Sequence, residues 1–190
     1  MLSKLETAGK NGQFRTPKHI REMMVRFIDP KPNQLLCDPA CGTAGFLITV
    51  AEHIRNNYES DMDEAAWEHF SGENGAEPQF TGFETDTTML RISTMNLMLH
   101  GVEKPDVRYM DSVSKNNVVS NKFDVILANT PFTGSVDKED IADTLKAMVN
   151  SKQTELLFVA LFLRMTAAIC IPISCSLTIL LIRSGFRTVR

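Results

Sequence analysis

Short apolar runs alternate along this chain with longer segments whose apolar residues recur every three or four positions. Four runs have the length of buried strands and are bounded by turn-forming residues, at 33–37, 79–83, 106–110 and 123–127. Three longer segments have helical spacing and begin near residues 17, 43 and 87. This alternation predicts an α/β fold with a mostly parallel sheet and helices on both of its faces.

Each predicted helix has a recognisable start or end and an apolar face. Thr16 can cap the first helix, with Pro17 at its first position. Asp86 can cap the third helix, and Gly101 ends it. The first helix presents Ile20, Met23, Met24, Phe27 and Ile28 on one side. The second presents Phe46, Leu47, Val50, Ala51 and Ile54, and the third presents Met89, Ile92, Leu97 and Leu99.

The composition is ordinary for one soluble globular domain. The 190 residues are enough to bury a substantial core. The net charge of −3 does not indicate that the chain binds nucleic acid. The cysteines have no C-x-x-C spacing, and they are Cys37, Cys41, Cys170 and Cys175. Neither a metal site nor a disulfide framework is expected, which fits a reducing cytoplasm. Residues 1–6 contain no apolar signal core, so export is not expected.

The charges are unevenly distributed. Between Asn56 and Leu90 the chain has nine acidic residues and no Lys or Arg. The part of this stretch before Glu77 is predicted to be a solvated surface insertion between two core elements. No functional role is needed to explain the acidic composition of this stretch.

The first strand leads into the loop 38–45, Asp-Pro-Ala-Cys-Gly-Thr-Ala-Gly, where the second helix begins. A strand, a tight loop of small residues and a helix start form the usual nucleotide-like binding site of α/β proteins. Gly42 and Gly45 let the backbone approach a ligand closely. The loop has no phosphate-binding Lys, and Asp38 would repel phosphate but hold a cationic amino group. The loop therefore predicts an adenosine-like, phosphate-free cation, with a tight turn that binds nothing as the alternative.

Two more acidic side chains follow strands. Glu84 ends the second strand, where an acid can accept hydrogen bonds from both hydroxyls of a ribose. Asp111 follows the third strand and could reach an adenine amino group. For both, a strand-end acid without a ligand is the alternative.

The fourth strand runs into Asn129, Thr130, Pro131 and Phe132. Open α/β sheets bind ligands at this end of their strands. A primary amide beside a Pro-fixed backbone carbonyl and a flat ring is suited to holding a planar amine. The same residues would also fit an ordinary strand exit, with Asn and Pro in a turn and Phe in the core.

Four segments in order resemble the motifs of amino-group DNA methyltransferases. They are Gly-Gln-Phe-Arg-Thr-Pro at 12–17, the loop 38–45 continued to residue 47, Gly-Phe-Glu-Thr-Asp at 82–86, and Asn-Thr-Pro-Phe at 129–132. The following Thr-Gly-Ser-Val-Asp at 133–137 is similar to the modification subunit of type I restriction-modification systems. The resemblance covers roughly residues 7–165. It implies a Rossmann-like S-adenosylmethionine-dependent methyltransferase fold, with an incomplete catalytic domain at 1–165.

The family implies S-adenosyl-L-methionine as cofactor and N6 of adenine in DNA as methyl acceptor. Residues 13–18 would close over the methionine part of the cofactor. The cofactor-binding residues expected are Gln13, Phe14, Arg15, Thr16, Pro17, Lys18, Asp38, Gly42, Thr43, Ala44, Gly45, Glu84 and Asp111. The catalytic residues expected are Asn129, Thr130, Pro131 and Phe132. The partners implied are DNA and separate specificity and restriction subunits, with no membrane.

The chemistry of the amine defines the mechanism that these residues would serve. The N6 lone pair of adenine is delocalised into the ring, so the nitrogen is a poor nucleophile. Hydrogen bonds from N6 to the Asn129 side-chain oxygen and the Thr130 carbonyl would favour a tetrahedral, nucleophilic nitrogen. The base must leave the duplex to be reached, and Phe132 would stack on it.

Two features depart from the family pattern. The family usually has Asn-Pro-Pro-Phe, so Thr130 makes the acceptor carbonyl less rigid, although Pro131 still biases Thr130 towards extended conformations. After Met165 the expected turn and strand are replaced by a segment, 166–190, that has no acidic residue. A truncated or out-of-frame tail is the main expectation for it. A membrane anchor and a divergent strand pair are the alternatives.

Two further functions remain open. A related Asn-Pro-Pro-aromatic tetrapeptide serves planar amides, so the acceptor could be a protein glutamine. The chain could also be an inactive remnant that binds cofactor weakly. The 13–17 and 134–137 segments favour DNA.

Overall fold

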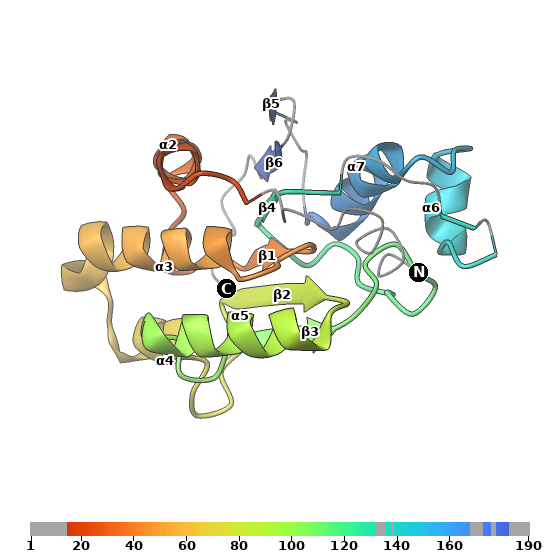
Figure 1. The fold of residues 1–190 in the computed structure, drawn as a ribbon. Coiled ribbons are helices and arrows are strands. Elements are labelled where there is room, and N and C mark those ends of the chain that lie inside the picture. The colour runs from red at the N-terminus through yellow and green to blue at the C-terminus, as the bar shows by residue number, and fades with distance from the viewer. Residues whose placement is uncertain (1–14, 132–135, 138, 168–172, 176–177, 183–190) are drawn as a thin grey trace.

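A computed structural model describes residues 15–131, 136–137, 139–167, 173–175 and 178–182. Its strands are β1 (Leu36–Asp38), β2 (Phe80–Glu84), β3 (Asp106–Tyr109), β4 (Val125–Ala128), β5 (Ile173–Cys175) and β6 (Thr178–Ile182). They form one sheet in the order β3-β2-β1-β4-β6-β5 (Figure 1). The first four strands of this order are parallel, as the sequence predicts.

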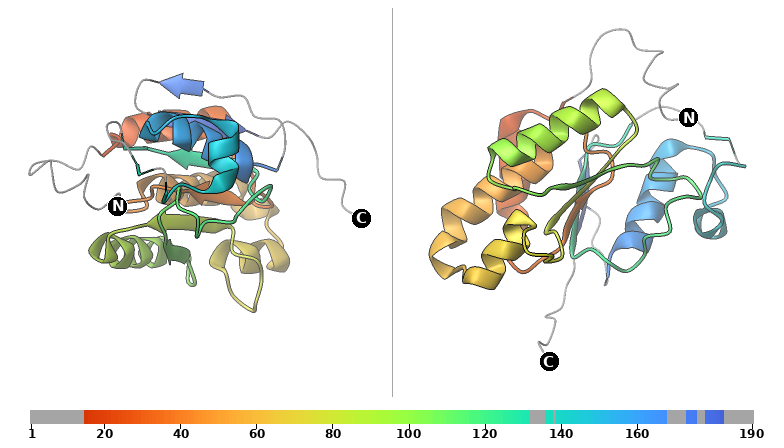
Figure 2. Two further views of the ribbon diagram at one scale, coloured as in Figure 1. Left: turned by 90° about the vertical axis from the view of Figure 1, so that its right-hand side faces the viewer. Right: turned by 90° about the horizontal axis from the view of Figure 1, so that it is seen from below.

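Helices cover both faces of the sheet. One face carries α2 (Lys18–Ile28), α3 (Gly45–Tyr58), α4 (Glu64–Ser71) and α5 (Thr87–Leu99), with a 3-10 turn at Glu59–Asp61. The other face carries α6 (Asp143–Met148) and α7 (Thr154–Met165). The right-hand view of Figure 2 shows the sheet on edge between these two layers. The prediction of a mostly parallel sheet between two helical layers is confirmed.

The central strands are short but buried at every position. All residues of β1, β2 and β4 are buried, whereas those of β3, at the sheet edge, are partly or fully exposed. Alternate side chains enter the two cores: Leu36 lies among the residues of α2 and α3, and Cys37 lies among those of α7. A parallel sheet covered on both faces explains why these segments read as continuous apolar runs.

The first helix differs from its prediction at its start. Pro17 occupies the N-cap position, and its carbonyl accepts hydrogen bonds from the Ile20 and Arg21 amides. Thr16 is therefore not the cap, and its carbonyl accepts a hydrogen bond from the Arg21 side chain. The predicted face was also partly wrong, because Met24 and Val25 are buried while Met23 and Phe27 are 56% and 71% exposed.

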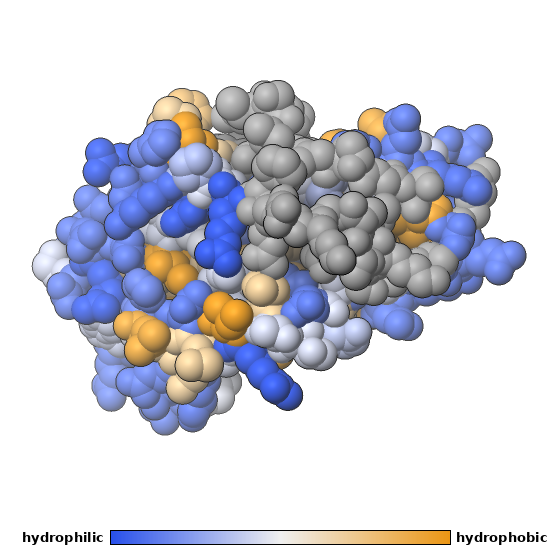
Figure 3. Space-filling view, viewed as in Figure 1, coloured by the Kyte–Doolittle hydropathy of each residue, from blue (hydrophilic) through white to orange (hydrophobic). Residues whose placement is uncertain are grey.

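The other helices agree more closely with the sequence. All five residues predicted for the core face of α3 are buried. The Asp86 carboxylate accepts hydrogen bonds from the Thr88 and Met89 amides, so the predicted cap of α5 is confirmed. Leu99 is 79% exposed and does not belong to the core face of α5. In Figure 3, orange hydrophobic side chains lie among blue ones on the surface over α5.

The acidic stretch is more than a solvated insertion. It folds into α4, whose start is capped by Asp63, since the Asp63 carboxylate accepts a hydrogen bond from the Ala66 amide. Phe70 of α4 is only 1% exposed and packs edge-to-face on Phe80 of β2, with ring centroids 5.2 Å apart. The apolar side of α4 anchors the helix, and the acidic side chains that are exposed are Glu59, Asp61, Asp63, Glu64 and Glu77.

The segment after Met165 contributes two strands to the sheet. β6 pairs antiparallel with β4, with Ala128 opposite Ile179, and β5 pairs antiparallel with β6. The tail thus contains a pair of strands, and its truncated or out-of-frame origin stays a prediction. Within the described part of the chain, no helix has the length and apolar character needed to cross a membrane.

Replacing Phe70 tests whether the acidic stretch belongs to the core. Phe70→Ala should lower the free energy of unfolding by about 3–5 kcal/mol, because a buried ring is replaced by a cavity. Phe27→Ala on α2, at a 71% exposed position, should change it by less than about 0.5 kcal/mol. Urea unfolding of both variants measures these differences. Equal effects would contradict the burial of Phe70 and the exposure of Phe27.

Candidate functional site

The carboxyl ends of β1, β2 and β4 lie at one edge of the sheet. The three strands are parallel neighbours, with Cys37 opposite Thr81 on one side and Ile126 on the other. The loop 38–45 follows β1, Glu84 ends β2, and Asn129 follows β4. This register brings the second, third and fourth of the four motif segments, those at 38–47, 82–86 and 129–132, to the same edge, where α/β sheets bind ligands.

The loop 38–45 is a tight turn with two residues in left-handed conformation. Gly42 has φ 53° and Ala44 has φ 62°. The Ala44 amide donates to the Cys41 carbonyl, 2.7 Å away. A Cβ atom on Gly42 would meet no atom within 4 Å, so glycine is required there by the backbone conformation and not by crowding. The open space beside Gly42 lets a ligand approach the backbone.

Neighbouring elements fix this loop at several points. The Cys41 amide donates to the Phe83 carbonyl of β2, 3.1 Å away. The Asn96 side chain of α5 donates to the Thr43 carbonyl at 3.1 Å, and the Ser112 hydroxyl donates to the Pro39 carbonyl at 2.5 Å. Neither Asn96 nor Ser112 carries a motif signal, so sequence reasoning missed both.

Gly82 of β2 belongs to the motif segment 82–86, but the sequence predicts no role for it. A Cβ atom at this position would lie 3.0 Å from the Cys41 Sγ, closer than packed atoms normally come. The absence of a side chain therefore lets the loop lie against β2. A glycine inside a predicted strand is the sequence signal that could have shown this close approach.

Asp38 is almost fully buried at the start of the loop. Its side chain is 2% exposed, and its Oδ1 accepts a hydrogen bond from the Ala40 amide, 3.0 Å away. Burial raises the pKa of Asp38 from 3.8 to about 8, the Ala40 amide opposes this, and the charge of Glu84 adds to it. A cationic group placed beside Asp38 would lower this pKa and favour the carboxylate.

The Glu84 side chain lies beside the loop 38–45 and also fixes it by a hydrogen bond. Its Oε1 accepts hydrogen bonds from the Thr85 and Asp86 amides at 2.7 and 2.9 Å. Its Oε2 accepts one from the Gly42 amide at 2.9 Å. A carboxylate offers about four acceptor positions, so these three amides leave one for a ligand hydroxyl. The bracing role of Glu84 was not expected from the sequence.

The other predicted residues are placed with different degrees of detail. Thr130 is 4% exposed, and Asn129 and Pro131 are partly buried, directly after β4. Asp111 follows β3 by two residues, and its Oδ1 accepts a hydrogen bond from the Val113 amide at 3.2 Å.

The segment 13–18 is described only in part. Thr16 is partly buried, whereas Arg15, Pro17 and Lys18 are exposed. Gln13, Phe14 and Phe132 lie outside the described residues.

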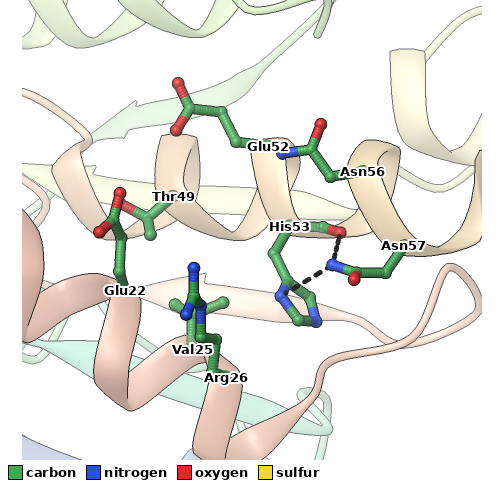
Figure 4. A pocket seen from close by; sticks show the side chains of 8 residues that line it. All are labelled: Glu22, Val25, Arg26, Thr49, Glu52, His53, Asn56 and Asn57. Atoms are coloured by element: carbon green, nitrogen blue, oxygen red, sulfur yellow. Dashed lines mark hydrogen bonds between the residues drawn. The ribbon is translucent and has the colours of Figure 1, made fainter.

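A separate hollow lies between α2 and α3 (Figure 4). Its volume is about 420 Å³. It is lined by Glu22, Val25, Arg26, Thr49, Glu52, His53, Asn56 and Asn57. These residues lie along the helices and not at the strand ends, so the hollow is distinct from the candidate site.

The donor set at the strand ends fits a particular ligand chemistry. Two carboxyl groups and a glycine loop suit an adenosine-like molecule with a cationic end, and Asp38 at the loop mouth disfavours phosphate. Among the described residues, no three His, Cys, Asp or Glu side chains gather as metal ligands.

The chain is similar to known proteins along most of its length. The family model described as N-6 DNA Methylase matches residues 1–170. The methylase subunit of the type I restriction enzyme EcoEI of Escherichia coli is 31% identical, over 88% of this chain and 33% of that protein. A modification subunit of a putative type I restriction enzyme from Vibrio vulnificus YJ016 is 29% identical with a TM-score of 0.66, over 86% of this chain and 33% of that one.

A more distant structure shows the fold class. A putative class I S-adenosylmethionine-dependent methyltransferase from Listeria monocytogenes has a TM-score of 0.55 at 18% identity, over 88% of this chain and 48% of that one. The Rossmann-like methyltransferase fold is therefore shown. This chain spans about a third of the length of the Escherichia coli and Vibrio vulnificus proteins named above.

Burial of Asp38 makes stability depend on pH. The pKa is 3.8 ordinarily and about 8 in the folded chain, so between these values the folded state holds a proton that the unfolded state has lost. The free energy of unfolding should therefore fall as pH rises through this window, by up to about 1.4 kcal/mol per pH unit. Asp38→Asn imitates the protonated carboxyl and should flatten the dependence.

Urea unfolding of the ligand-free chain at about pH 5, 7 and 9 measures this dependence. Asp61→Asn, which changes an exposed acid, is the matched control. A slope in Asp38→Asn as steep as in the parent would show that another group is responsible.

Proposed function

The chain belongs to the N-6 DNA methylase family, and from this premise we propose that it transfers the methyl group of S-adenosylmethionine to N6 of adenine in DNA. The observation that carries the proposal is the joining of the loop 38–45 to Glu84 at adjacent strand ends, through the Gly42 amide and the Glu84 Oε2 at 2.9 Å. Residues 129–131 follow the neighbouring strand β4 at the same edge.

The cofactor site proposed here uses the two carboxyl groups in different ways. Buried Asp38 takes the cationic amino group of the methionine part, and the remaining acceptor position of Glu84 takes a ribose hydroxyl. The backbone of Gly42, Thr43, Ala44 and Gly45 lines the pocket, and Asp111 reaches the adenine amino group. Gln13, Phe14, Arg15, Thr16, Pro17 and Lys18 close over the methionine part. The bound cofactor supplies an electrophilic methyl group on a sulfonium.

The amine site proposed here is formed by the residues that follow β4. The Asn129 side-chain oxygen and the Thr130 carbonyl accept hydrogen bonds from N6 of adenine, and they orient its lone pair towards the methyl group. Phe132 stacks on the base after it has left the duplex. The protein provides positioning and electrostatic stabilisation, without a covalent enzyme intermediate.

Thr130 stands where the family usually has proline, and its surroundings support a working role. Its side chain is 4% exposed, so packing restricts the residue. Pro131 further limits Thr130 to extended conformations. These two restraints supply part of the rigidity that a proline ring would give to the acceptor carbonyl.

The proposed setting is that of the relatives. The EcoEI protein is a methylase subunit of a type I restriction enzyme. For this chain we infer the same kind of assembly, with DNA, a specificity subunit and a restriction subunit, in the cytoplasm. In this setting residues 1–165 form the incomplete catalytic domain, and 166–190 form an atypical tail.

Removing Glu84 tests the cofactor site. Glu84→Ala should weaken S-adenosylmethionine binding by about 1–3 kcal/mol, because the ribose loses its acceptor and the loop loses the brace at Gly42. Glu59→Ala, at an exposed acidic position, should leave affinity unchanged. Isothermal titration calorimetry measures both, with a melting curve for each variant to confirm folding. Unchanged affinity in folded Glu84→Ala would remove this residue from the site.

Removing the Asn129 amide tests the chemical step separately from cofactor binding. Asn129→Ala should abolish methyl transfer to DNA while cofactor affinity stays within about threefold, since the amide acts on N6. Asn116→Ala, at an exposed position, is the control. Transfer of labelled methyl groups to DNA and to protein is measured with the partner subunits present. Transfer at the parent rate in Asn129→Ala would show that residues 129–132 form only a strand exit.

A further inference from the structure

Ser112, which follows Asp111, donates a buried hydrogen bond to the first half of the loop 38–45. Its hydroxyl donates to the Pro39 carbonyl, 2.5 Å away, and Ser112 is 1% exposed. Pro39 is buried as well, and as a proline it has no backbone N–H through which a neighbouring element could hold it. The carbonyl of Pro39 is therefore the polar backbone group by which this residue can be held, and Ser112 supplies the donor.

The backbone around Ser112 has supports of its own. The Asn117 side chain, which is 1% exposed, donates to the Ser112 carbonyl at 2.7 Å. The next carbonyl, that of Val113, accepts a hydrogen bond from the Ala142 amide at 3.0 Å. The Ser112 hydroxyl thus projects from backbone that is itself fixed, so it can hold the loop in one place.

The second half of the loop is held by other residues. The Asn96 side chain donates to the Thr43 carbonyl at 3.1 Å. The Thr49 hydroxyl donates to the Gly45 carbonyl at 2.8 Å, and it accepts a hydrogen bond from the Arg21 side chain at 3.2 Å. Loss of the hydrogen bond to the first half would leave these contacts in place, so its effect should be confined to that half.

The bond between Ser112 and Pro39 links two acidic residues of the candidate site. Asp38 directly precedes Pro39, and its carboxyl accepts a hydrogen bond from the Ala40 amide, so its direction depends on the conformation of this turn. Asp111 directly precedes Ser112 in the chain. The hydroxyl therefore ties the backbone beside one acid to the backbone beside the other.

We propose that Ser112 is a positioning residue of the cofactor site, whose hydroxyl fixes the place of Asp38 relative to Asp111. This inference rests on the proposed function, because it assumes that both acids face S-adenosylmethionine. Ser112 acts through Pro39, and it need not touch the ligand. A loop that is already held in its binding position loses less conformational freedom when the ligand binds.

Removing the hydroxyl tests this role. Ser112→Ala should weaken S-adenosylmethionine binding about fivefold, because the Pro39 carbonyl loses its donor and the loop is no longer held in one position. Calorimetry on the full chain measures the affinity. In methyl transfer with the partner subunits present, the same change should raise KM for the cofactor and leave kcat within about twofold, since the reacting groups are unchanged once the site is filled.

Two control variants separate positioning from a general loss of stability. Ser114→Ala removes a hydroxyl of the same turn, which donates locally to the Asp111 carbonyl at 2.8 Å. Thr166→Val removes a buried hydroxyl that donates to the Phe162 carbonyl at 2.6 Å, beside the start of β4 and not at the strand ends of the site. Both should bind S-adenosylmethionine within about twofold of the parent, although Thr166→Val should lower the melting temperature as Ser112→Ala does.

A second measurement needs no ligand. Amide hydrogen exchange in the free chain, followed by NMR, reports local opening of the loop. The Ala40 and Cys41 amides should exchange faster in Ser112→Ala than in Ser114→Ala, because only the first change releases the Pro39 carbonyl. The amide of Ala44, in the second half of the loop, should exchange equally in both.

The outcomes separate this inference from the proposed function. A parent chain that does not bind S-adenosylmethionine contradicts the proposed cofactor, and the exchange comparison then still decides whether Ser112 holds the loop. Parent-like affinity in folded Ser112→Ala, the same loss of affinity in Thr166→Val, or equal exchange of the Ala40 and Cys41 amides would each overturn the role of Ser112.

Discussion

The site depends on one carboxylate, that of Glu84, which accepts hydrogen bonds from three backbone amides. Two of the amides belong to the residues after β2, and the third belongs to Gly42 in the loop after β1. Because Gly42 is in the left-handed conformation, its amide can turn towards the neighbouring strand. Strand pairing alone aligns β1 with β2, whereas the Glu84 carboxylate also fixes the loop that continues beyond them. The contacts of Cys41 with Gly82 and of Arg21 with Gly45 complete this fixed loop.

The two carboxyl groups at this edge lie in contrasting surroundings. Glu84 is held by three amides, whereas the carboxyl of Asp38 is buried, and the Ala40 amide is the hydrogen-bond donor described for it. The cost of burying a charge raises the pKa of Asp38, and the nearby Glu84 raises it further. A cationic ligand compensates for both effects at once. Burial at the end of β1 thus favours the protonated form of Asp38 unless a cation lies beside it.

The sequence predicts the positions of the central strands well because burial on both faces leaves continuous apolar runs. It also predicts the cap at Asp86, since a side chain that bonds to its own helix start is a local interaction. The exposed faces of α2 and α5 were misassigned at Met23, Phe27 and Leu99, because hydrophobicity alone does not show which apolar positions have a packing partner. Phe70 was missed for the converse reason, because a stretch rich in acidic residues gives no sign that one of its apolar side chains is buried against β2.

The residues of the candidate site also fall into two groups, those that the sequence predicts and those that it does not. The sequence predicts Asp38, Gly42 and Glu84 as site residues because these residue types follow strands, and the sheet register brings the ends of those strands to one edge. Arg21, Thr49, Asn96 and Ser112 were not identified. Their roles arise from hydrogen bonds across long stretches of sequence, and a helix surface or loop offers many such polar residues. The structural roles of these residues depend on tertiary contacts, which a local sequence pattern does not reveal.

The antiparallel pairing of β6 with β4 bears on how this chain behaves in concentrated solution. Without β6, the parallel part of the sheet would end at β4, whose residues Val125–Ala128 are apolar and whose outer backbone groups would be unpaired. An open apolar edge of this kind recruits strands from other molecules, which is a common origin of aggregation. The tail therefore covers this edge of the parallel strands. Whatever the origin of the tail, β6 occupies the hydrogen-bonding positions of β4 through which one copy of the chain would otherwise associate with another.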